Sequence, residues 1–192
     1  MRDSRTAAML RSALAAALVS VSAAISIPIG PVPVTLQLLA LAVIVLLLSP
    51  GEALAATVLY VAIGAIGLPV FSGASGGVGV LLGPTGGFLL GFVAGAPAGA
   101  WMRRRVRSWL PGRPMLADVA GVSSLVVIAY GLGWARLAAV TGMDAAAAFG
   151  VAVAPFLLPD ALKVAGAIAV ARAARHAGLE DRSTDDGTAA SV

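Results

Sequence analysis

Asp160 and Lys163 are the residues of this sequence whose chemistry stands out most, because both lie inside a long apolar run. Their spacing of three places both side chains on one face of a helix, with the acid nearer the N-terminus, where it suits the helix dipole. An ionisable residue at membrane depth is costly and usually serves a ligand or a transport path. The alternative is a self-neutralising pair, in which Asp160 caps the helix and Lys163 extends away toward the membrane surface. We favour a ligand site, since Pro159 breaks the helix where its polar start would otherwise be costly to expose.

Two other segments carry polar groups between apolar runs. In "GPVPVTLQLLA", residues 30–40, the prolines turn the chain, and Thr35 and Gln37 then enter the next span, where they either face a pocket or cap a helix. The glycine-rich residues 70–87 contain no Gly-Lys-Ser/Thr and no G-x-G-x-x-G in the right frame, so nucleotide binding is excluded. Such a loop either bends over a shallow pocket and offers backbone N–H groups to a small polar solute, or merely lies close to the bundle. The candidate binding residues are therefore Asp160, Lys163, Gln37, Gly77, Thr85 and Gly86.

No catalytic or metal chemistry emerges from the remaining residues. The chain has no cysteine and one histidine, His176, so neither a zinc nor a haem site is expected, and no cofactor is predicted. An aspartyl intramembrane protease needs a second buried carboxylate, whereas Asp118 is expected near the start of its helix. Glu52, just after Pro50, indicates a first-turn acid of a helix. We predict that the protein is not an enzyme.

The elements that carry these residues are membrane-spanning helices. Of the 192 residues, 59% are hydrophobic and only 11% charged, and the mean hydropathy is +0.97. This composition is typical of an integral membrane protein. Residues 7–27 resemble a signal peptide in their basic front, but Arg11 lies inside the run and no cleavage site follows. We therefore predict an all-α, six-helix membrane domain over residues 1–176, and a polar, disordered tail over residues 177–192. The predicted spans are residues 7–27, 34–48, 52–68, 86–102, 116–134 and 145–174, the last interrupted by Pro155 and Pro159, with its final helix beginning at Asp160.

The distribution of arginines predicts the orientation. An even number of spans places both termini on one side, and eleven of the thirteen basic residues fall there. They are Arg2, Arg5, Arg11, Arg103, Arg104, Arg105, Arg107, Arg113, Arg172, Arg175 and Arg182. Both termini and the loop after residue 102 are therefore predicted to be cytoplasmic. Arg136, beside Trp134, is expected to reach the opposite membrane interface. The run "RRRVR" suits lipid headgroups, and no base-reading side chains accompany it, so a nucleic-acid partner is not expected.

Small residues recur at every fourth position on three of the predicted helices, a pattern that lets helices approach closely in lipid. For the glycines at 83, 87, 91, 95 and 99 we expect packing inside the bundle. Internal packing is also the simplest interpretation of the alanines at 161, 165, 169 and 173, which repeat the same spacing. The first helix either packs in the same way or forms a docking surface for another membrane subunit. Its candidate interface residues are Ser12, Ala13, Ala16, Ala17 and Ser20.

Three separated motifs together resemble the BioY family, the biotin-specific S components of bacterial energy-coupling-factor (ECF) transporters. They are "ISIPIGPVPVTLQ", "GAIGLPVFSGASGGVGVLLGPTGGFLLGF" and "LPDALK". The likeness covers roughly residues 7–175 and follows the family's order. The sequence "PDALK" departs from the glycine and larger aliphatic residue common in the family, but both charged positions are kept.

The resemblance implies a multi-pass protein of the bacterial plasma membrane that binds biotin from outside. Its implied partners are a transmembrane T component, which meets the small-residue face of the first helix, and two ATPase subunits. Asp160 and Lys163 match the family's biotin-contacting Asp-x-x-Lys. An ionised Asp160 suits a ureido N–H of biotin as acceptor. Lys163 binds either the ureido carbonyl or the carboxylate of biotin. Phe71, Phe88 and Phe156 either wall the ligand or pack the bundle.

Two other functions remain as alternatives. A stand-alone secondary transporter for biotin or a related small vitamin is disfavoured, because no inverted repeat and few buried ionisable groups are present. A structural scaffold would leave Asp160 and Lys163 without a task.

Overall fold

The computed structural model describes residues 2–28 and 31–176, which are largely helical. The helices are α1 Arg2–Ala24, α2 Gln37–Leu47, α3 Pro50–Ala65, α4 Val78–Leu82, α5 Gly86–Trp109, α6 Pro114–Thr141, α7 Ala145–Ala152 and α8 Leu157–His176. Two short 3-10 helices, η1 Ser72–Ala74 and η2 Ala154–Phe156, interrupt the connections. The strands β1 Ser26–Ile27 and β2 Val34–Thr35 pair antiparallel, with Ser26 opposite Thr35. The predicted tail, residues 177–192, lies outside the described residues.

The helix lengths and composition identify an all-α, multi-pass membrane protein. Within the described residues, three helical stretches are long and apolar enough to cross a bilayer: Ser4–Ala24, Pro114–Thr141 and Ala145–Arg175. The helices α2 and α3 are apolar but shorter. Each of the six apolar segments expected from the sequence therefore contains a helix, but their lengths are unequal.

The boundaries of the last three predicted spans differ from the structure. The span expected to end at residue 102 continues as α5 to Trp109, so Arg103, Arg104, Arg105 and Arg107 lie in this helix and not in a loop after it. The helix expected to end near Trp134 continues to Thr141, where Gly142 adopts a left-handed conformation (φ 70°) and ends it. The final helix begins at Leu157, so the predicted start at Asp160 is wrong. Pro159 fits in the first turn of α8 because the amide that proline lacks would have no partner inside the helix there.

Glycine allows α5 and α6 to pack closely. A Cβ atom on Gly91 would lie 2.6 Å from the Cα atom of Ala129, and one on Gly99 would lie 2.5 Å from the carbonyl oxygen of Gly121. The predicted glycine ladder thus packs inside the bundle, except that Gly83 ends α4 instead of belonging to α5. The alanine ladder of α8 differs from the expectation, because Ala161, Ala165, Ala169 and Ala173 are exposed.

Ion pairs with two buried carboxylates join the helices at one end of the bundle. Asp118 of α6 accepts from Arg103 of α5 at 2.9 Å and from Arg175 of α8 at 2.9 and 3.0 Å. Arg11 of α1 pairs with Glu52 at 2.6 Å. Glu52 also forms a capping box with Ser49 at the start of α3, which confirms it as a first-turn acid. Arg11, Arg103 and Arg175, all on the predicted cytoplasmic side, therefore have carboxylate partners among the described residues.

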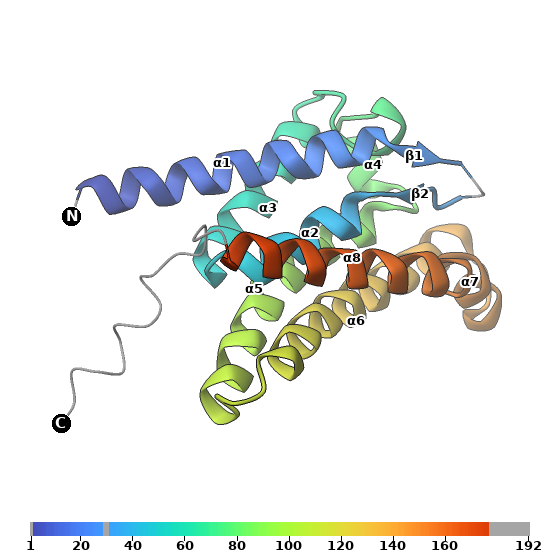
Figure 1. Ribbon diagram of the computed structural model, residues 1–192. Helices are drawn as coiled ribbons and strands as arrows, with labels where there is room; N and C mark the ends of the chain where they lie inside the picture. The colour runs from blue at the N-terminus through green and yellow to red at the C-terminus, as the bar shows by residue number, and fades with distance from the viewer. Residues whose placement is uncertain (1, 29–30, 177–192) are drawn as a thin grey trace.

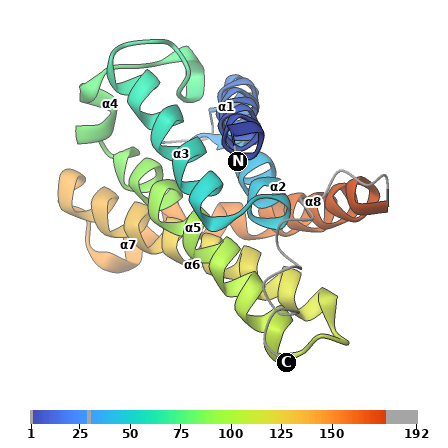
Figure 2. The ribbon, with the colours of Figure 1, turned by 90° about the vertical axis from the view of Figure 1, so that its left-hand side faces the viewer.

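The helix α2 lies at the centre of the bundle and contacts α1, α5, α6 and α8. The first residues of α1 and the last of α8 lie at one end, while the β1–β2 hairpin and α7 lie at the other (Figure 1). Figure 2 shows the same bundle with α1 viewed nearly along its axis. This arrangement brings the start of α2, the middle of α6 and the start of α8 together near the hairpin end.

Candidate ligand-binding cavity

A cavity of about 130 Å³ lies at this meeting point. A cavity of about 150 Å³ binds a molecule of the size of benzene, so this one has room for a small organic ring. Its lining is mainly apolar, with a few polar groups contributed by separate elements, as is usual for ligand sites. The lining residues are Val32, Pro33, Thr35, Gln37, Leu38, Phe71, Ser72, Ser75, Val80, Thr85, Phe88, Leu89, Phe92, Ala129, Tyr130, Phe156, Asp160 and Lys163.

Asp160 and Lys163 form one polar side of the cavity. Lys163 Nζ lies 2.5 Å from Asp160 Oδ1, and the Tyr130 hydroxyl donates to Asp160 Oδ2. The Asp160 side chain is 9% exposed and that of Lys163 10%. The pair is thus a buried ion pair that faces the cavity. Asp160 is not the helix cap, because α8 begins three residues earlier, and Lys163 does not extend to the membrane surface.

Gln37 forms a second polar side from the first residue of α2. Its Nε2 donates to the Tyr60 hydroxyl at 2.6 Å, and its Oε1 accepts from Thr35 Oγ1 at 3.0 Å. Gln37 therefore faces the pocket with its amide held in one orientation, rather than capping the helix. The N-cap residue Leu36 makes no side-chain capping bond, but Thr35 Oγ1 accepts from the Gln37 backbone N–H at 3.3 Å, so Thr35 both lines the cavity and binds the first amide of α2.

Aromatic rings form much of the apolar lining. Phe71, Phe88 and Phe156, the three rings expected from the sequence, all line the cavity, and Phe92 joins them. Phe88 packs edge-on against Tyr130, with ring centroids 6.4 Å apart. The walls can therefore enclose a flat apolar ring between hydrogen-bonding groups.

The glycine-rich segment contributes less than the sequence suggested. Thr85 lines the cavity, but Gly77 and Gly86 are not among the lining residues. The Gly77 N–H already donates to the Gly64 carbonyl at 2.6 Å. At Gly86 a Cβ atom would lie 1.8 Å from the Leu81 carbonyl oxygen, so glycine is needed there for the close turn between α4 and α5.

Two residues in the C-terminal part of α6 hold neighbouring segments together. Arg136 Nη2 donates to the Leu82 carbonyl at 2.5 Å, at the end of α4. Trp134 Nε1 donates to the Ala145 carbonyl at 2.9 Å, at the start of α7. Both side chains therefore hydrogen-bond to backbone carbonyls of neighbouring helices. The sequence predicted only a position at the membrane interface for them.

Sequence reasoning missed Tyr130, Ser72 and Ser75. A tyrosine in an apolar span is a polar group at membrane depth, so the criterion that selected Asp160 would have found Tyr130. The two serines could not be distinguished from others in the glycine-rich segment. Ser75 Oγ donates to the Ser72 carbonyl at 2.8 Å, while Ser72 Oγ is buried and has no hydrogen-bond partner among the described residues.

The predicted docking face of α1 is only partly accessible. Ser12 and Ala16 are buried within the chain, and Ser12 Oγ lies 3.3 Å from the Glu52 carbonyl oxygen of α3. Ala13 and Ala17 are exposed and Ser20 is half-buried. Ser12 and Ala16 thus serve internal packing.

The fold of this membrane protein is also found in a solved structure. Its structure matches the crystal structure of the S component for biotin from an ECF-type ABC transporter, with a TM-score of 0.83 over 92% of this chain and 94% of that one. The two sequences are 20% identical, so this likeness concerns the fold.

Sequence relatives place the chain more narrowly. A family model described as the BioY family matches residues 1–179. A probable biotin transporter BioY from Pyrococcus horikoshii is 39% identical over 66% of this chain and 70% of its own length. The biotin transporter BioY2 from Lactococcus lactis is 32% identical over 85% of this chain and 87% of its own. The chain belongs to the BioY family, as the three motifs indicated.

Proposed function

We propose that this protein is the biotin-capturing S subunit of an ECF-type transporter in a bacterial plasma membrane, with six spans and both termini in the cytoplasm. It binds biotin from the outer side and passes it to a coupling module of one T component and two ATPase subunits. The observation that carries the proposal is the cavity that Asp160, Lys163, Tyr130 and Gln37 line together with aromatic side chains.

The polar groups of the cavity complement those of biotin. The ureido ring offers two N–H donors and a carbonyl acceptor, the thioether ring is largely apolar, and the tail ends in a carboxylate. Asp160 accepts from Lys163 and Tyr130, and its oxygens retain lone pairs for a ureido N–H. Lys163 donates to the ureido carbonyl or to the carboxylate. The four phenylalanines cover the rings.

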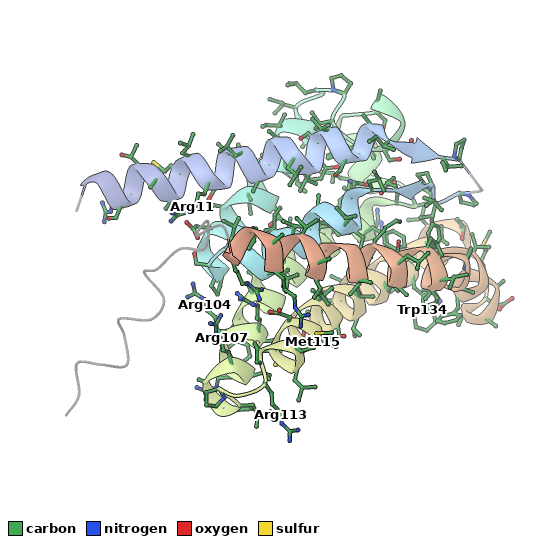
Figure 3. All side chains as sticks on the ribbon, in the orientation of Figure 1. Arg11, Arg104, Arg107, Arg113, Met115 and Trp134 are labelled. Carbon is green, nitrogen blue, oxygen red and sulfur yellow. The ribbon has the colours of Figure 1, made fainter. Side chains whose placement is uncertain are left out.

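The charge distribution supports an outward-facing cavity. The labelled Arg11, Arg104, Arg107 and Arg113 lie toward the end that carries the N-terminus, while Trp134 lies toward the end with α7 (Figure 3). Arginine-rich ends of membrane proteins face the cytoplasm. The hairpin, α7 and the cavity beside them therefore face outward.

Binding and transport test different parts of the proposal. The purified chain should retain labelled biotin, and a chain that retains none would refute biotin capture. Proteoliposomes should take up biotin only when the coupling subunits and ATP are present. Uptake by this chain alone would instead identify a stand-alone secondary transporter.

The exposed part of the α1 face can be tested separately. We expect Ala17→Leu to weaken assembly with the T component while leaving biotin retention unchanged, because Ala17 is exposed beside Ala13. Ala24→Leu, at an exposed position on the far end of α1, is the control. Equal assembly by both variants would argue against this docking face.

A further inference from the structure

Tyr60 of α3 is fully buried, at 0% exposure, and is not among the cavity-lining residues. It nevertheless contacts two residues that do line the cavity. Its hydroxyl accepts from Gln37 Nε2 at 2.6 Å, and its ring centroid lies 5.5 Å from that of Phe71 at an angle of 80°. One side chain of α3 therefore contacts two walls of the cavity from behind.

The hydroxyl determines how the Gln37 amide is presented. With Thr35 bound to Oε1 and Tyr60 bound to Nε2, one N–H and one lone pair of the amide remain for a ligand. Gln37 is 5% exposed, so an amide without the tyrosine partner would carry a buried, unpaired donor. The tyrosine hydroxyl thus gives the buried amide a partner on α3 and fixes where it lies.

The ring and the neighbouring glycine hold the turn after α3. Tyr60 and Gly64 lie four residues apart on one face of α3, and a Cβ atom on Gly64 would lie 2.1 Å from Phe71 Cζ. The Gly64 carbonyl also accepts from the Gly77 N–H, and the Phe71 N–H donates to the Ser75 carbonyl at 3.0 Å. Residues 71–77, which include the cavity-lining Ser72 and Ser75, are therefore anchored on this face.

We propose that Tyr60 is a positioning residue that aligns Gln37 through its hydroxyl and the Phe71–Ser75 turn through its ring, so that both walls are preformed for the ligand. This role rests on the proposed capture of biotin. It requires that the hydroxyl act on affinity only through Gln37, whereas the ring acts on the turn even without ligand.

A double-mutant cycle tests the hydroxyl. Tyr60→Phe should weaken biotin binding about 5- to 20-fold, the effect of unpairing a buried polar group. Gln37→Leu should also weaken it, and the double variant should bind within about twofold of Gln37→Leu alone. Thr57→Val is the matched control, because it removes another fully buried α3 hydroxyl that bonds only to its own helix, and it should bind like wild type. Unchanged binding by Tyr60→Phe, or losses that simply add, would overturn the role of the hydroxyl.

Hydrogen exchange without ligand tests the ring. Tyr60→Leu should accelerate amide exchange in peptides covering residues 70–77 on the order of tenfold, because the turn loses its aromatic contact. Tyr60→Phe keeps the ring and should exchange like wild type. Equal exchange in all three proteins would overturn the role of the ring. If wild type binds no biotin, the proposed function fails, while this exchange experiment still decides whether Tyr60 positions the turn.

Discussion

Asp160 satisfies the requirements of a carboxylate at membrane depth by contacting two donors that also line the cavity. The cost of burying a charge is offset by the ion pair with Lys163 and by the hydrogen bond from Tyr130. The three polar groups are therefore already oriented before a ligand arrives. This preorganisation lowers the cost of binding.

Asp160→Asn should reduce biotin affinity about 10- to 100-fold, because it removes a charged acceptor and leaves Lys163 buried beside a neutral amide. Titration of the purified protein with labelled biotin measures this. Asp144→Asn is the matched control at the same end of the bundle, where Asp144 caps α7 and asparagine caps equally well. Wild-type affinity of Asp160→Asn would exclude Asp160 from the binding site.

Lys163→Met should reveal which group of biotin Lys163 binds. If Lys163 binds the carboxylate, the variant should lose about tenfold or more in affinity for biotin and little for biotinamide. If it binds the ureido carbonyl, both ligands should lose affinity equally. The ratio of the two dissociation constants, measured in parallel by competition, decides between the two contacts. Undiminished affinity for both ligands would remove Lys163 from the site.

Ser72→Ala should change stability and binding in opposite directions. The Ser72 hydroxyl is buried without a partner among the described residues, so its removal should raise the melting temperature of the ligand-free protein slightly. If the hydroxyl is reserved for the ligand, biotin affinity should fall about 3- to 20-fold. Ser75→Ala should instead lower the melting temperature, because it breaks the bond to the Ser72 carbonyl. A Ser72→Ala protein that is both less stable and unchanged in affinity would contradict this assignment.

At the scale of the elements, close contact between α5 and α6 supports one wall of the cavity. Phe88, Leu89 and Phe92 come from α5, while Ala129 and Tyr130 come from α6. The glycines of α5 set the distance between these helices, and therefore the width available to a ligand.

Gly91→Ala should destabilise the protein by about 1–3 kcal/mol, because the new Cβ atom would lie 2.6 Å from the Cα atom of Ala129 and would force the helices apart. Thermal unfolding in detergent measures the effect. Gly131→Ala is the control, since a Cβ atom at this α6 position meets nothing within 4 Å. Equal melting temperatures for both variants would show that the α5–α6 distance tolerates the added atom.

At the scale of the whole molecule, the two ends of the bundle differ in charge and in architecture. One end carries the arginine-rich last turns of α5 and the buried Asp118 cluster, and the other carries the hairpin and α7. Such asymmetry suits a protein that receives a solute on one side and meets its partners from the other.

Single introduced cysteines can test the orientation, because the chain has none of its own. Met143→Cys, in the exposed turn between α6 and α7, should react with an impermeant maleimide in intact cells. Ser108→Cys, at the exposed end of α5, should react only after permeabilisation. The reverse pattern would invert the proposed topology and place the cavity on the cytoplasmic side.

The sequence alone determined the helical membrane class, the position of each apolar segment, and Asp160 and Lys163 as the prominent polar pair. These features depend on hydropathy, charge and the spacing of residues along one helix, all of which can be read from residues close together in the sequence. The internal role of the α5 glycines was also predictable, because small residues at every fourth position signal close packing in lipid.

Only the tertiary structure decided which residues share the cavity. Tyr130 reaches Asp160 across 30 positions and Gln37 reaches Tyr60 across 23, and both contacts depend on how separate helices pack. The same packing excluded Gly77 and Gly86 from the lining and buried Ser12 and Ala16 against the chain's own helices. A local sequence pattern cannot show which residues of a helix line the cavity and which are buried, because this depends on where the neighbouring helices pack.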